Sequence, residues 1–362
     1  MFKPTIIDLF AGVGGLSLGF EMAGFKVVLA NEIDKDIALS YKKNRPRVNL
    51  IVEDITKLPI EKTFANYVKS VDVIVGGPPC QGFSQKGKRK SINDKRNFLF
   101  QYFFKVVEFV RPRYFVMENV PNLLTTENGY FKKEIFQLFQ SIGYSLSAKI
   151  LNASDYGVPQ NRRRAIIIGK LHGMPIIFPE CLDKKTTVWE AISDLSFLDS
   201  AEGEEIQNYR SEPQTPYQRM LRKNSTALWN HIATKHSQIA IERMKLIPFK
   251  GDRSSLPKEH LTKSIYSGTW SRMHPDDVSV TITTRFDTPS SGKFTHPFLN
   301  RAITVREAAR IQSFPDTFHF FGTKTSQMKQ VGNAVPPLLA KTIAEKIYED
   351  MTNSNETTFQ LT

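Results

Sequence analysis

Short apolar strands alternate with helical segments along the first half of the chain. Runs typical of buried strands lie at Thr5–Leu9, Lys26–Ala30, Val48–Val52, Val71–Val75, Tyr114–Met117 and Ala165–Ile168. Helical spacing of apolar residues lies between them, at Asp34–Lys43, Phe98–Val110 and Phe131–Ile142. An intervening helix returns the chain to the same edge of a sheet, so successive strands run parallel. We therefore predict an α/β fold with a doubly wound, largely parallel sheet.

The alternation stops near residue 180, and the sequence is then polar and spaced by prolines as far as about residue 300. Helical spacing returns at Val305–Ser313 and Pro337–Met351, and residues 353–362 are typical of a frayed tail. With 362 residues, of which 40% are hydrophobic, the chain is long enough for one large domain and one smaller one. Its longest apolar runs are strand-length, so we expect no membrane span.

The strand expected at Val71–Val75 leads through Gly76-Gly77-Pro78-Pro79 into Cys80. Open α/β sheets bind ligands outside the carboxyl ends of their strands, and two prolines fix the backbone of the turn. Cys80 is therefore a candidate nucleophile, and the alternative is a small buried hydrophobe in a tight turn. The only other cysteine is Cys181, which excludes a disulfide framework, and a reactive thiol would have to stay reduced. We expect an intracellular protein without a signal peptide.

The formal charge of +13 is concentrated in the part of the chain that holds Cys80. Residues 1–169 contain 25 lysines and arginines against 15 acidic residues. Much of this excess lies at Lys86, Lys88, Arg89, Lys90, Lys95 and Arg96, and at Arg162, Arg163 and Arg164. A polyanion is the natural partner of such a surface. A solvated loop, or a localisation signal at Lys86 to Lys90, remains an alternative.

A glycine-rich turn, Asp8-Leu9-Phe10-Ala11-Gly12-Val13-Gly14-Gly15, follows the first expected strand. Ser17 stands where the third glycine of the dinucleotide fingerprint would be, and a glycine turn alone is about as often structural as functional. Glu32 lies 20 residues beyond Gly12, at the end of the second strand, where an acid can bind ribose hydroxyls. These features favour a nucleoside cofactor without pyrophosphate, such as S-adenosylmethionine. Asp54-Ile55, after the third strand, would receive its adenine ring.

Several motifs occur in a fixed order across about residues 5–345. They are Asp8–Gly15, Asn31-Glu32, Asp54-Ile55, Gly77–Ser84, Arg96–Leu99, Glu118-Asn119-Val120, Gln160–Arg164, Arg306-Glu307 and Gln330–Val335. In this ordered set the chain resembles a DNA (cytosine-5)-methyltransferase of the bacterial restriction-modification type. Two mild departures are Asn97-Phe98 in the segment before Leu99 and Gly82 after the candidate nucleophile. The resemblance implies a Rossmann-like, S-adenosylmethionine-dependent methyltransferase domain and a smaller, irregular target-recognition domain.

The resemblance implies covalent catalysis on cytosine. The thiolate of Cys80 would add to C6, which makes C5 nucleophilic enough to attack a methyl sulfonium. Glu118 would protonate or hydrogen-bond N3 of the ring. Arg164 would contact the cytosine O2, and Arg162 would steady the thiolate or its loop. Because these arginines are two residues apart on an expected strand, both should face the same side.

The resemblance also implies a cofactor site and a DNA surface. S-adenosyl-L-methionine, which leaves as S-adenosyl-L-homocysteine, would be bound by Asp8, Phe10, Ala11, Gly12, Gly14, Gly15, Glu32, Asp54, Ile55, Pro78, Leu99, Asn333 and Val335. A stacked base is out of reach of these groups, so the target cytosine would flip out of the duplex. DNA contacts would come from Gln81, Ser84, Lys88, Arg89, Lys90, Arg96, Arg272, Thr281, Thr283, Arg285 and Lys293, with His274 as a further candidate. Thr281 would face a phosphate from an expected strand at Ser279–Phe286.

We expect residues 1–185 and 326–352 to form a discontinuous catalytic and cofactor-binding domain. Residues 186–300 would form the target-recognition domain, residues 301–325 a hinge region and residues 353–362 a flexible tail. Double-stranded DNA is the expected partner, and a cognate restriction endonuclease would act on the same site without stable contact. We expect a monomeric cytoplasmic enzyme, associated with the nucleoid through DNA, that protects DNA within a restriction-modification system.

Other interpretations stay open. Enzymes that methylate amino groups carry an aromatic residue after the paired prolines, where this chain has Cys80. RNA cytosine-5 methylases of another type use a cysteine at the position of Glu118, and the tRNA-methylating branch of the family is the closest enzyme rival. A catalytically inactive DNA-binding module is a further alternative, which intact Cys80, Glu118 and Glu32 disfavour. His231 and His236 would suggest a metal, but no cysteine or carboxylate completes a tetrahedral set, so a structural role is favoured.

Overall fold

The computed structural model describes residues 3–79, 98–263 and 268–359, which divide into two compact units. The first unit comprises Met1–Asn152, Arg163–Cys181 and Pro337–Thr362, and the second comprises Ala153–Arg162 and Leu182–Pro336. The first unit is discontinuous, as expected, but its last segment starts at Pro337 rather than at residue 326. Residues 153–162, which were expected in the first unit, belong to the second.

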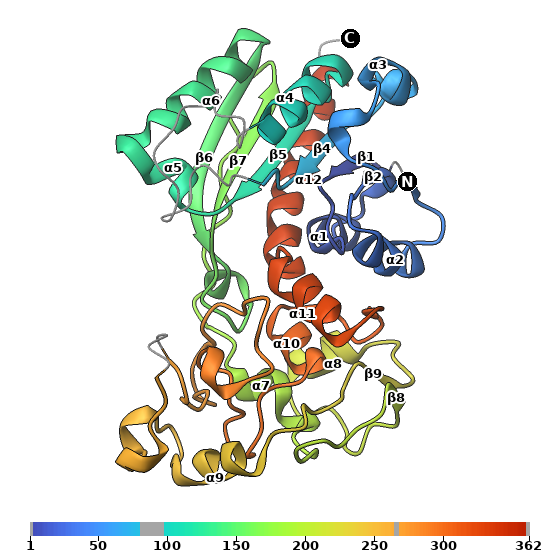
Figure 1. Ribbon diagram of the computed structural model, residues 1–362. Coiled ribbons are helices and arrows are strands. Elements are labelled where there is room, and N and C mark those ends of the chain that lie inside the picture. The colour runs from blue at the N-terminus through green and yellow to red at the C-terminus, as the bar shows by residue number, and fades with distance from the viewer. Residues whose placement is uncertain (1–2, 80–97, 264–267, 360–362) are drawn as a thin grey trace. The chain divides into compact units, whose positions relative to one another are not determined.

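A seven-stranded sheet forms the centre of the first unit, in the order β3-β2-β1-β4-β5-β7-β6 (Figure 1). Its strands are β1 (Thr5–Leu9), β2 (Lys26–Asn31), β3 (Asn49–Ile51), β4 (Val73–Gly76), β5 (Tyr114–Asn119), β6 (Tyr144–Asn152) and β7 (Arg163–Leu171). The strands β1 to β5 are parallel, and β7 runs antiparallel to its neighbours β5 and β6. The doubly wound, largely parallel sheet predicted from the sequence is confirmed.

The described part of the first unit also contains seven α-helices. They are α1 (Gly15–Met22), α2 (Lys35–Asn44), α3 (Ile60–Phe64), α4 (Phe98–Val110), α5 (Asn122–Thr125), α6 (Tyr130–Ser141) and α12 (Pro337–Phe359). The start of α2 is fixed by Asp34, whose carboxylate accepts hydrogen bonds from the backbone N–H groups of Asp36 and Ile37. Among the described residues, no helix is both long enough and apolar enough to cross a membrane.

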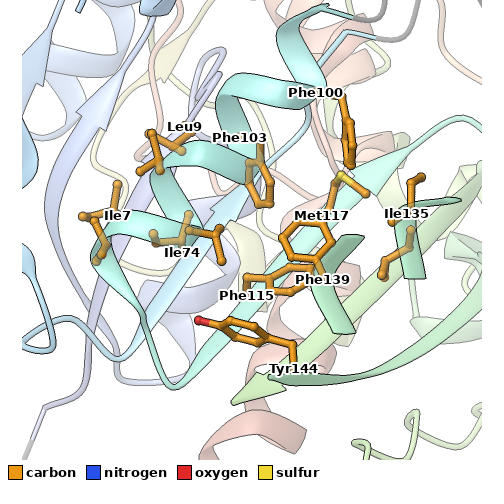
Figure 2. Packing of buried hydrophobic residues seen from close by; sticks show 14 of the residues in the cluster. Ile7, Leu9, Ile74, Phe100, Phe103, Phe115, Met117, Ile135, Phe139 and Tyr144 are labelled. Atoms are coloured by element: carbon orange, nitrogen blue, oxygen red, sulfur yellow. The ribbon is translucent and has the colours of Figure 1, made fainter. Parts of the chain in front are cut away.

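Aromatic side chains fill the face of the sheet that α4 and α6 cover (Figure 2). Phe115 of β5 stacks on Phe139 of α6 with ring centroids 4.1 Å apart, and Phe103 of α4 meets Phe115 edge-on. The ring of Phe115 lies across Gly169 of β7, where a Cβ atom would come within 2.0 Å of it. Burial of one such ring contributes about 1.5–3 kcal/mol. This packing makes the central strands a rigid support for the residues at their ends.

The C-terminal helix α12 returns the chain to the first unit. It packs closely against α1 at Gly19, where a Cβ atom would lie 2.4 Å from the Cβ atom of Ala340. The Tyr114 hydroxyl of β5 donates a hydrogen bond of 2.6 Å to the Asp350 carboxylate. The helix continues to Phe359, past the start of the tail expected at residue 353.

The strand β6 was not expected from the sequence. It lies at the edge of the sheet, and only some of its side chains are buried. A partly exposed edge strand lacks the continuous apolar run that identifies the inner strands of a parallel sheet. Its partner β7 begins at Arg163, two residues before the expected start at Ala165.

The second unit contains little regular structure. It holds a two-stranded sheet of β8 (Ile206–Gln207) and β9 (Leu228–Trp229), and the helices α7 (Val188–Ile192), α8 (Pro216–Arg222), α9 (Gln238–Leu246), α10 (Val305–Ile311) and α11 (Lys324–Asn333). The strand expected at Ser279–Phe286 is wrong, because Ser279 makes only an isolated bridge with Gln160 and the described residues after it are irregular. The backbone N–H of Ile282 donates to the Gln160 side chain instead of a neighbouring strand.

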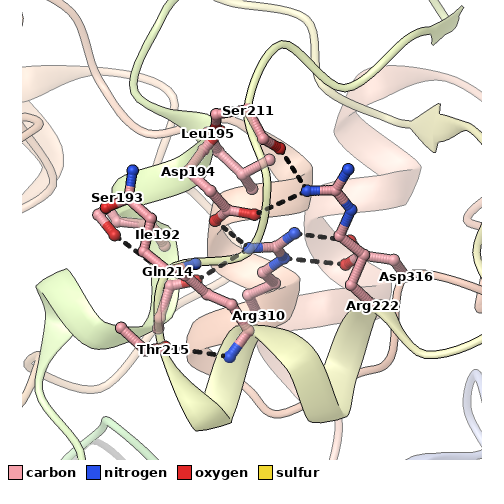
Figure 3. Close-up of polar contacts among 12 residues, drawn as sticks. Ile192, Ser193, Asp194, Leu195, Ser211, Gln214, Thr215, Arg222, Arg310 and Asp316 are labelled. Atoms are coloured by element: carbon pink, nitrogen blue, oxygen red, sulfur yellow. Dashed lines mark hydrogen bonds and ion pairs between the residues drawn. The ribbon is translucent and has the colours of Figure 1, made fainter.

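Buried charges fix α10 in the second unit (Figure 3). The guanidinium of Arg310 donates hydrogen bonds to the carboxylates of Asp194 and Asp316, and these three side chains are fully buried. Arg222 lies 3.7 Å from the other oxygen of Asp194. Every residue of α10 is buried. The range 301–325, expected as a hinge region, thus includes the buried helix α10, which paired charges fix in the core of the second unit.

Two histidines connect loops within this unit. The ring nitrogens of His231 lie 2.9 Å from the Thr304 hydroxyl and 3.0 Å from the Leu195 carbonyl oxygen. Burial lowers the pKa of His231 to about 4, so its ring is neutral near pH 7. The backbone N–H of Ala302 donates to His236 at 3.0 Å. These hydrogen bonds are the structural role that the sequence analysis favoured for both histidines.

Replacing Arg310 by methionine should destabilise the second unit strongly. The change leaves the carboxylates of Asp194 and Asp316 buried without their counter-charge, which costs about 3–5 kcal/mol. Urea unfolding followed by tryptophan fluorescence is the measurement, since Trp189, Trp229 and Trp270 all belong to this unit.

The matched control is Lys184→Met, which removes an exposed ion pair with Glu190. It should cost less than about 1 kcal/mol. Equal losses in the two variants would contradict the central role of the buried network.

Candidate active site

Strands of the large sheet end at one edge with glycine-rich or polar segments. The strand order reverses between β1 and β4, because β2 lies on the other side of β1. Open α/β sheets bind ligands outside this point of reversal. Because β7 is antiparallel to β5, its first residues lie at the same edge as the last residues of β5.

The turn after β4 is described as far as Pro79, and Cys80 lies outside the described residues. The DNA-contact candidates Gln81, Ser84, Lys88, Arg89, Lys90 and Arg96 also lie outside them. The side-chain amide of Asn119, the last residue of β5, donates to the carbonyl of the buried Pro78 at 2.8 Å. Asn119 thus fixes the turn that leads to Cys80. The sequence analysis gave Asn119 no role, although a polar residue ending an apolar strand was a signal.

Glu118 and Arg164 form an ion pair at this edge. Arg164 Nε lies 2.8 Å from Glu118 Oε1, and the two side chains are 15% and 13% exposed. Glu118 pairs with Ile166 across the β5–β7 ladder, so Arg164 is its diagonal neighbour on the same face. A Cβ atom at Gly77 would lie 2.9 Å from Glu118 Oε2. The two candidates are therefore brought together beside the start of the proline turn.

Arg162 does not share the strand of Arg164. It precedes β7, belongs to the second unit and is 1% exposed. Its carbonyl accepts from the backbone N–H of Ala153, and its guanidinium donates to the carbonyls of Ile282 and Gly332. The expectation that both arginines face the same side of one strand is wrong, because the chain leaves the ladder before Arg162.

The turn after β1 has an unusual backbone. Phe10, Gly12 and Gly14 have φ values of 55°, 57° and 88°, in the left-handed region. A Cβ atom at Gly12 would meet no heavy atom within 4 Å, whereas one at Gly14 would lie 2.6 Å from Arg45 Nη1. Gly12 therefore borders open space suited to a ligand, and Gly14 is required by packing. Ala11 and Gly15, the other candidates of this turn, are buried.

Glu32 follows β2 and binds the backbone of the glycine turn. Its carboxylate accepts from the N–H of Gly12 at 2.7 Å and from the N–H of Asp34 at 2.8 Å. Burial raises the pKa of Glu32, and these backbone hydrogen bonds partly offset the rise. Each carboxylate oxygen has a further lone pair, so Glu32 can accept from ligand hydroxyls at a fixed position.

Asp8, the residue before the last of β1, is 1% exposed. Burial raises the pKa of Asp8 to about 7, although a hydrogen bond with Ser17 and the charge of Arg45 lower it. Its Oδ2 atom has no hydrogen-bond partner among the described residues. A buried carboxyl oxygen of this kind, on the strand that leads into an open turn, can accept from a ligand donor.

Arg45, at the end of α2, was missed by the sequence analysis. It is 6% exposed and donates from Nη2 to the Gly14 carbonyl at 2.9 Å and from Nε to Glu21 at 2.7 Å. Its guanidinium lies over the Tyr41 ring, 4.7 Å from the centroid. Arg45 therefore fixes the glycine turn. The sequence offered no signal, because Arg45 lies in a basic run, 42–47, typical of a solvated surface.

The remaining cofactor candidates divide between the units. In the first unit, Asp54 accepts from the backbone N–H of Thr56, which lowers the pKa of Asp54, while Ile55 is buried in the core and Leu99 packs against it. Asn333, exposed at the end of α11, and the buried Val335 belong to the second unit.

The DNA candidates in the second unit differ in exposure. Arg272 is 5% exposed and donates five hydrogen bonds to other residues of this unit. Its expected DNA contact is wrong, because all five guanidinium N–H groups are used. Thr283 and Arg285 are exposed, and Thr281, His274 and Lys293 are half-buried. The Thr281 hydroxyl donates to the Asn161 carbonyl at 2.6 Å.

The first unit thus combines a Rossmann-like sheet with an open glycine turn, a fixed carboxylate at Glu32 and a mostly buried ion pair beside a proline turn. Residues 4–349 match the family of C-5 cytosine-specific DNA methylases. The chain belongs to this family and is a DNA (cytosine-5-)-methyltransferase. The family and the fold imply the use of S-adenosylmethionine.

Relatives of the chain are similar over almost its whole length. Type II methyltransferase M.DdeI of Desulfomicrobium norvegicum is 42% identical over 95% of this chain and 88% of that protein. Type II methyltransferase M1.HphI of Haemophilus parahaemolyticus is 40% identical over 96% of this chain and 88% of that protein. A crystal structure assigned to a prophage-encoded DNA modification methyltransferase of Escherichia coli has a TM-score of 0.77 at 29% identity, covering 97% of this chain and 100% of that one.

The substitution Asp8→Asn should change how stability depends on pH. The folded protein retains the Asp8 proton up to about pH 7, whereas the unfolded chain releases it near pH 3.8. The raised folded pKa means that Asp8 makes the wild type lose stability as pH rises between these values. Asparagine does not titrate, so the stability of the variant relative to wild type should rise over that range and then level off. Urea unfolding at a series of pH values measures this difference, and a difference independent of pH would contradict the raised pKa.

The substitution Arg45→Met should weaken S-adenosylmethionine binding about tenfold, since loss of a hydrogen bond to a charged group costs about 1.5–3 kcal/mol and part of the turn remains fixed. Calorimetry without DNA measures this affinity. Arg47→Met is the matched control, because Arg47 is exposed and carries the same charge two residues away. Equal cofactor affinity in the two variants would rule out the positioning role of Arg45.

Proposed function

We propose that this enzyme transfers the methyl group of S-adenosyl-L-methionine to C5 of a cytosine flipped out of duplex DNA at a specific sequence. The observation that supports this most is the mostly buried Glu118–Arg164 pair beside Gly77, where the turn toward Cys80 begins. A carboxyl group and a guanidinium side by side match N3 and O2 of cytosine, which are both bonded to C2. A stacked base would not reach these groups, so the proposal includes base flipping.

Cys80 is the proposed nucleophile. Its thiolate adds to C6, and Glu118, which has to be protonated for this step, stabilises the electron density that moves to the ring by giving a proton or hydrogen bond to N3. Arg164 fixes Glu118 and donates to O2, so it stabilises the same negative charge. C5 then accepts the methyl group. The C5 proton is lost to solvent while the C6–S bond to Cys80 breaks, which releases the thiolate and restores the aromatic ring. Arg162 acts as a positioning residue by anchoring the chain that precedes β7.

The described residues fit S-adenosylmethionine, which supplies the methyl group as an electrophile when bound and leaves as S-adenosylhomocysteine. Support comes from the open space at Gly12, the fixed carboxylate of Glu32 and the Asp8 oxygen without a described partner. Glu32 would accept from the ribose hydroxyls, and Asp54 with Ile55 would receive adenine. The rest of the proposed site is Phe10, Ala11, Gly14, Gly15, Pro78, Leu99, Asn333 and Val335.

We assign sequence recognition to the second unit. The irregular loops of this unit offer exposed Thr283 and Arg285 and half-buried Thr281 and Lys293 as DNA contacts. Basic residues of the first unit would bind phosphates without regard to sequence, at Lys88, Arg89, Lys90 and Arg96, while Gln81 and Ser84 would fill the space of the flipped base. The enzyme would work as a monomer in the cytoplasm, on nucleoid DNA.

We also propose that methylation protects DNA within a restriction-modification system. Support comes from the relatives, which are named as type II methyltransferases. A cognate endonuclease would act on the same site, and the two enzymes would share a DNA sequence rather than a stable contact.

Expression of the chain in a host that lacks cytosine methylation tests the proposed function. Bisulfite sequencing of host DNA should then show one short sequence in which a single cytosine resists conversion. Parallel expression of the wild type and of the Glu118→Gln variant separates this activity from background methylation of the host DNA. DNA without resistant cytosines, with RNA that gains the mark, would overturn the proposal in favour of an RNA methylase.

The nucleophile has its own test. Duplex DNA with 5-fluorocytosine at the target should form an adduct that survives a denaturing gel, because fluorine cannot leave as the C5 proton does. Cys80→Ala should abolish the adduct. Cys181→Ala is the matched control and should behave like wild type, since Cys181 is an exposed free thiol. An adduct that persists in Cys80→Ala would contradict the assignment.

A further inference from the structure

Two phenylalanine rings lie stacked on the surface of the second unit. Phe249 follows α9 and Phe298 lies in the loop before α10; their ring centroids are 5.4 Å apart and their planes differ by 14°. They remain 52% and 49% exposed, although Trp189 packs edge-on against Phe298 at 4.7 Å. Adjacent large apolar groups exposed to water on an ordered surface mark a contact surface.

Arg272 joins the two loops that carry these rings. It donates to carbonyls at the end of α9, from Nε to Ile247 at 2.8 Å and from Nη2 to Met244 at 2.7 Å. Its other hydrogen bonds reach the second loop, at the carbonyls of His296 and Leu299 and the Asn300 side chain. Because every guanidinium N–H is used, the ring pair rests on a rigid base. The pair is thus preorganised for contact rather than an accident of two mobile loops.

The charge around the pair favours a polyanion. The acceptors of Arg272 are four carbonyls and one amide, so no carboxylate among the described residues neutralises it. The segment 243–253 adds four basic residues against the single acid Asp252. Lys250 Nζ lies 5.2 Å from the Phe249 ring centroid and also pairs with Asp276 at 2.7 Å. Aromatic rings among cations are typical of nucleic-acid surfaces.

We propose that Phe249 and Phe298 contact the target DNA through the apolar edge of a nucleotide and contribute to sequence recognition. The edge is either a thymine 5-methyl group, which phenylalanine contacts in the major groove, or a deoxyribose face. Arg272 is a positioning residue for both rings. This inference rests on the proposed assignment of DNA reading to the second unit.

The test measures kcat/KM on a short duplex that contains the site found by bisulfite sequencing. Phe249→Ala and Phe298→Ala should each lower kcat/KM roughly tenfold, the usual loss for one base contact. The loss should lie mainly in KM for DNA, with the KM for S-adenosylmethionine unchanged. Met220→Ala is the matched control, because Met220 is 42% exposed in the same unit and lies away from these loops in the sequence. It should behave like wild type.

A set of duplexes, each with deoxyuridine in place of one thymine, distinguishes contact with a thymine methyl group from contact with a deoxyribose. If a thymine methyl group is contacted, one substitution should slow wild type about tenfold and leave the phenylalanine variants unaffected. If a deoxyribose is contacted, no substitution should matter while the variants remain slow.

If Phe298→Ala does not fold, Phe298→Leu takes its place in the same measurement, because leucine keeps an apolar contact with Trp189. Folded phenylalanine variants with wild-type kcat/KM on every substrate would overturn this inference and leave the proposed function intact. Failure of the wild type to methylate any DNA would overturn both.

Discussion

The hydrogen-bonded alignment of β1, β4, β5 and β7 is the constraint on which the site depends. Parallel strands end at a common edge, so segments far apart in the sequence meet there without any long connection. The antiparallel β7 brings its first residues to that edge, which places Arg164 diagonally across from Glu118. A shift of one residue in this register would turn Arg164 to the opposite face of the sheet. The packed aromatic core beneath the strands preserves the register.

Charged groups with little exposure are paired in both units. Arg310 is neutralised by Asp194 and Asp316 and stabilises the core of the second unit. Glu118 and Arg164 are paired in a similar way but lie at the edge of the sheet of the first unit, beside the turn toward Cys80. Full burial of a complete network indicates a structural role. His231, whose two ring nitrogens are both used, is a further example.

The inner strands were predictable from the sequence, because they are continuous apolar runs bounded by turn residues. The partly exposed edge strand β6 was not, and the burial of α10 within the expected hinge region was not either. The errors at Arg162 and Arg272 differ in kind: Arg162 lies outside the strand that was expected to carry it with Arg164, and Arg272 was expected to contact DNA. Both guanidinium groups donate to carbonyls inside the second unit. An arginine can be buried where backbone carbonyls accept hydrogen bonds from its guanidinium. These carbonyls are distant in the sequence, so the local sequence pattern does not reveal them.

The sequence by itself determined the class of fold and the family, and it singled out Glu118 and Glu32 as site candidates, because strand periodicity and ordered motifs are local properties of the chain. The tertiary structure decided which side chains meet. Only the folded chain shows Arg45 on the carbonyl of Gly14, because α2 must first pack beside α1. Only the folded chain stacks Phe249 on Phe298, 49 residues apart, because their approach depends on long-range packing rather than on sequence spacing.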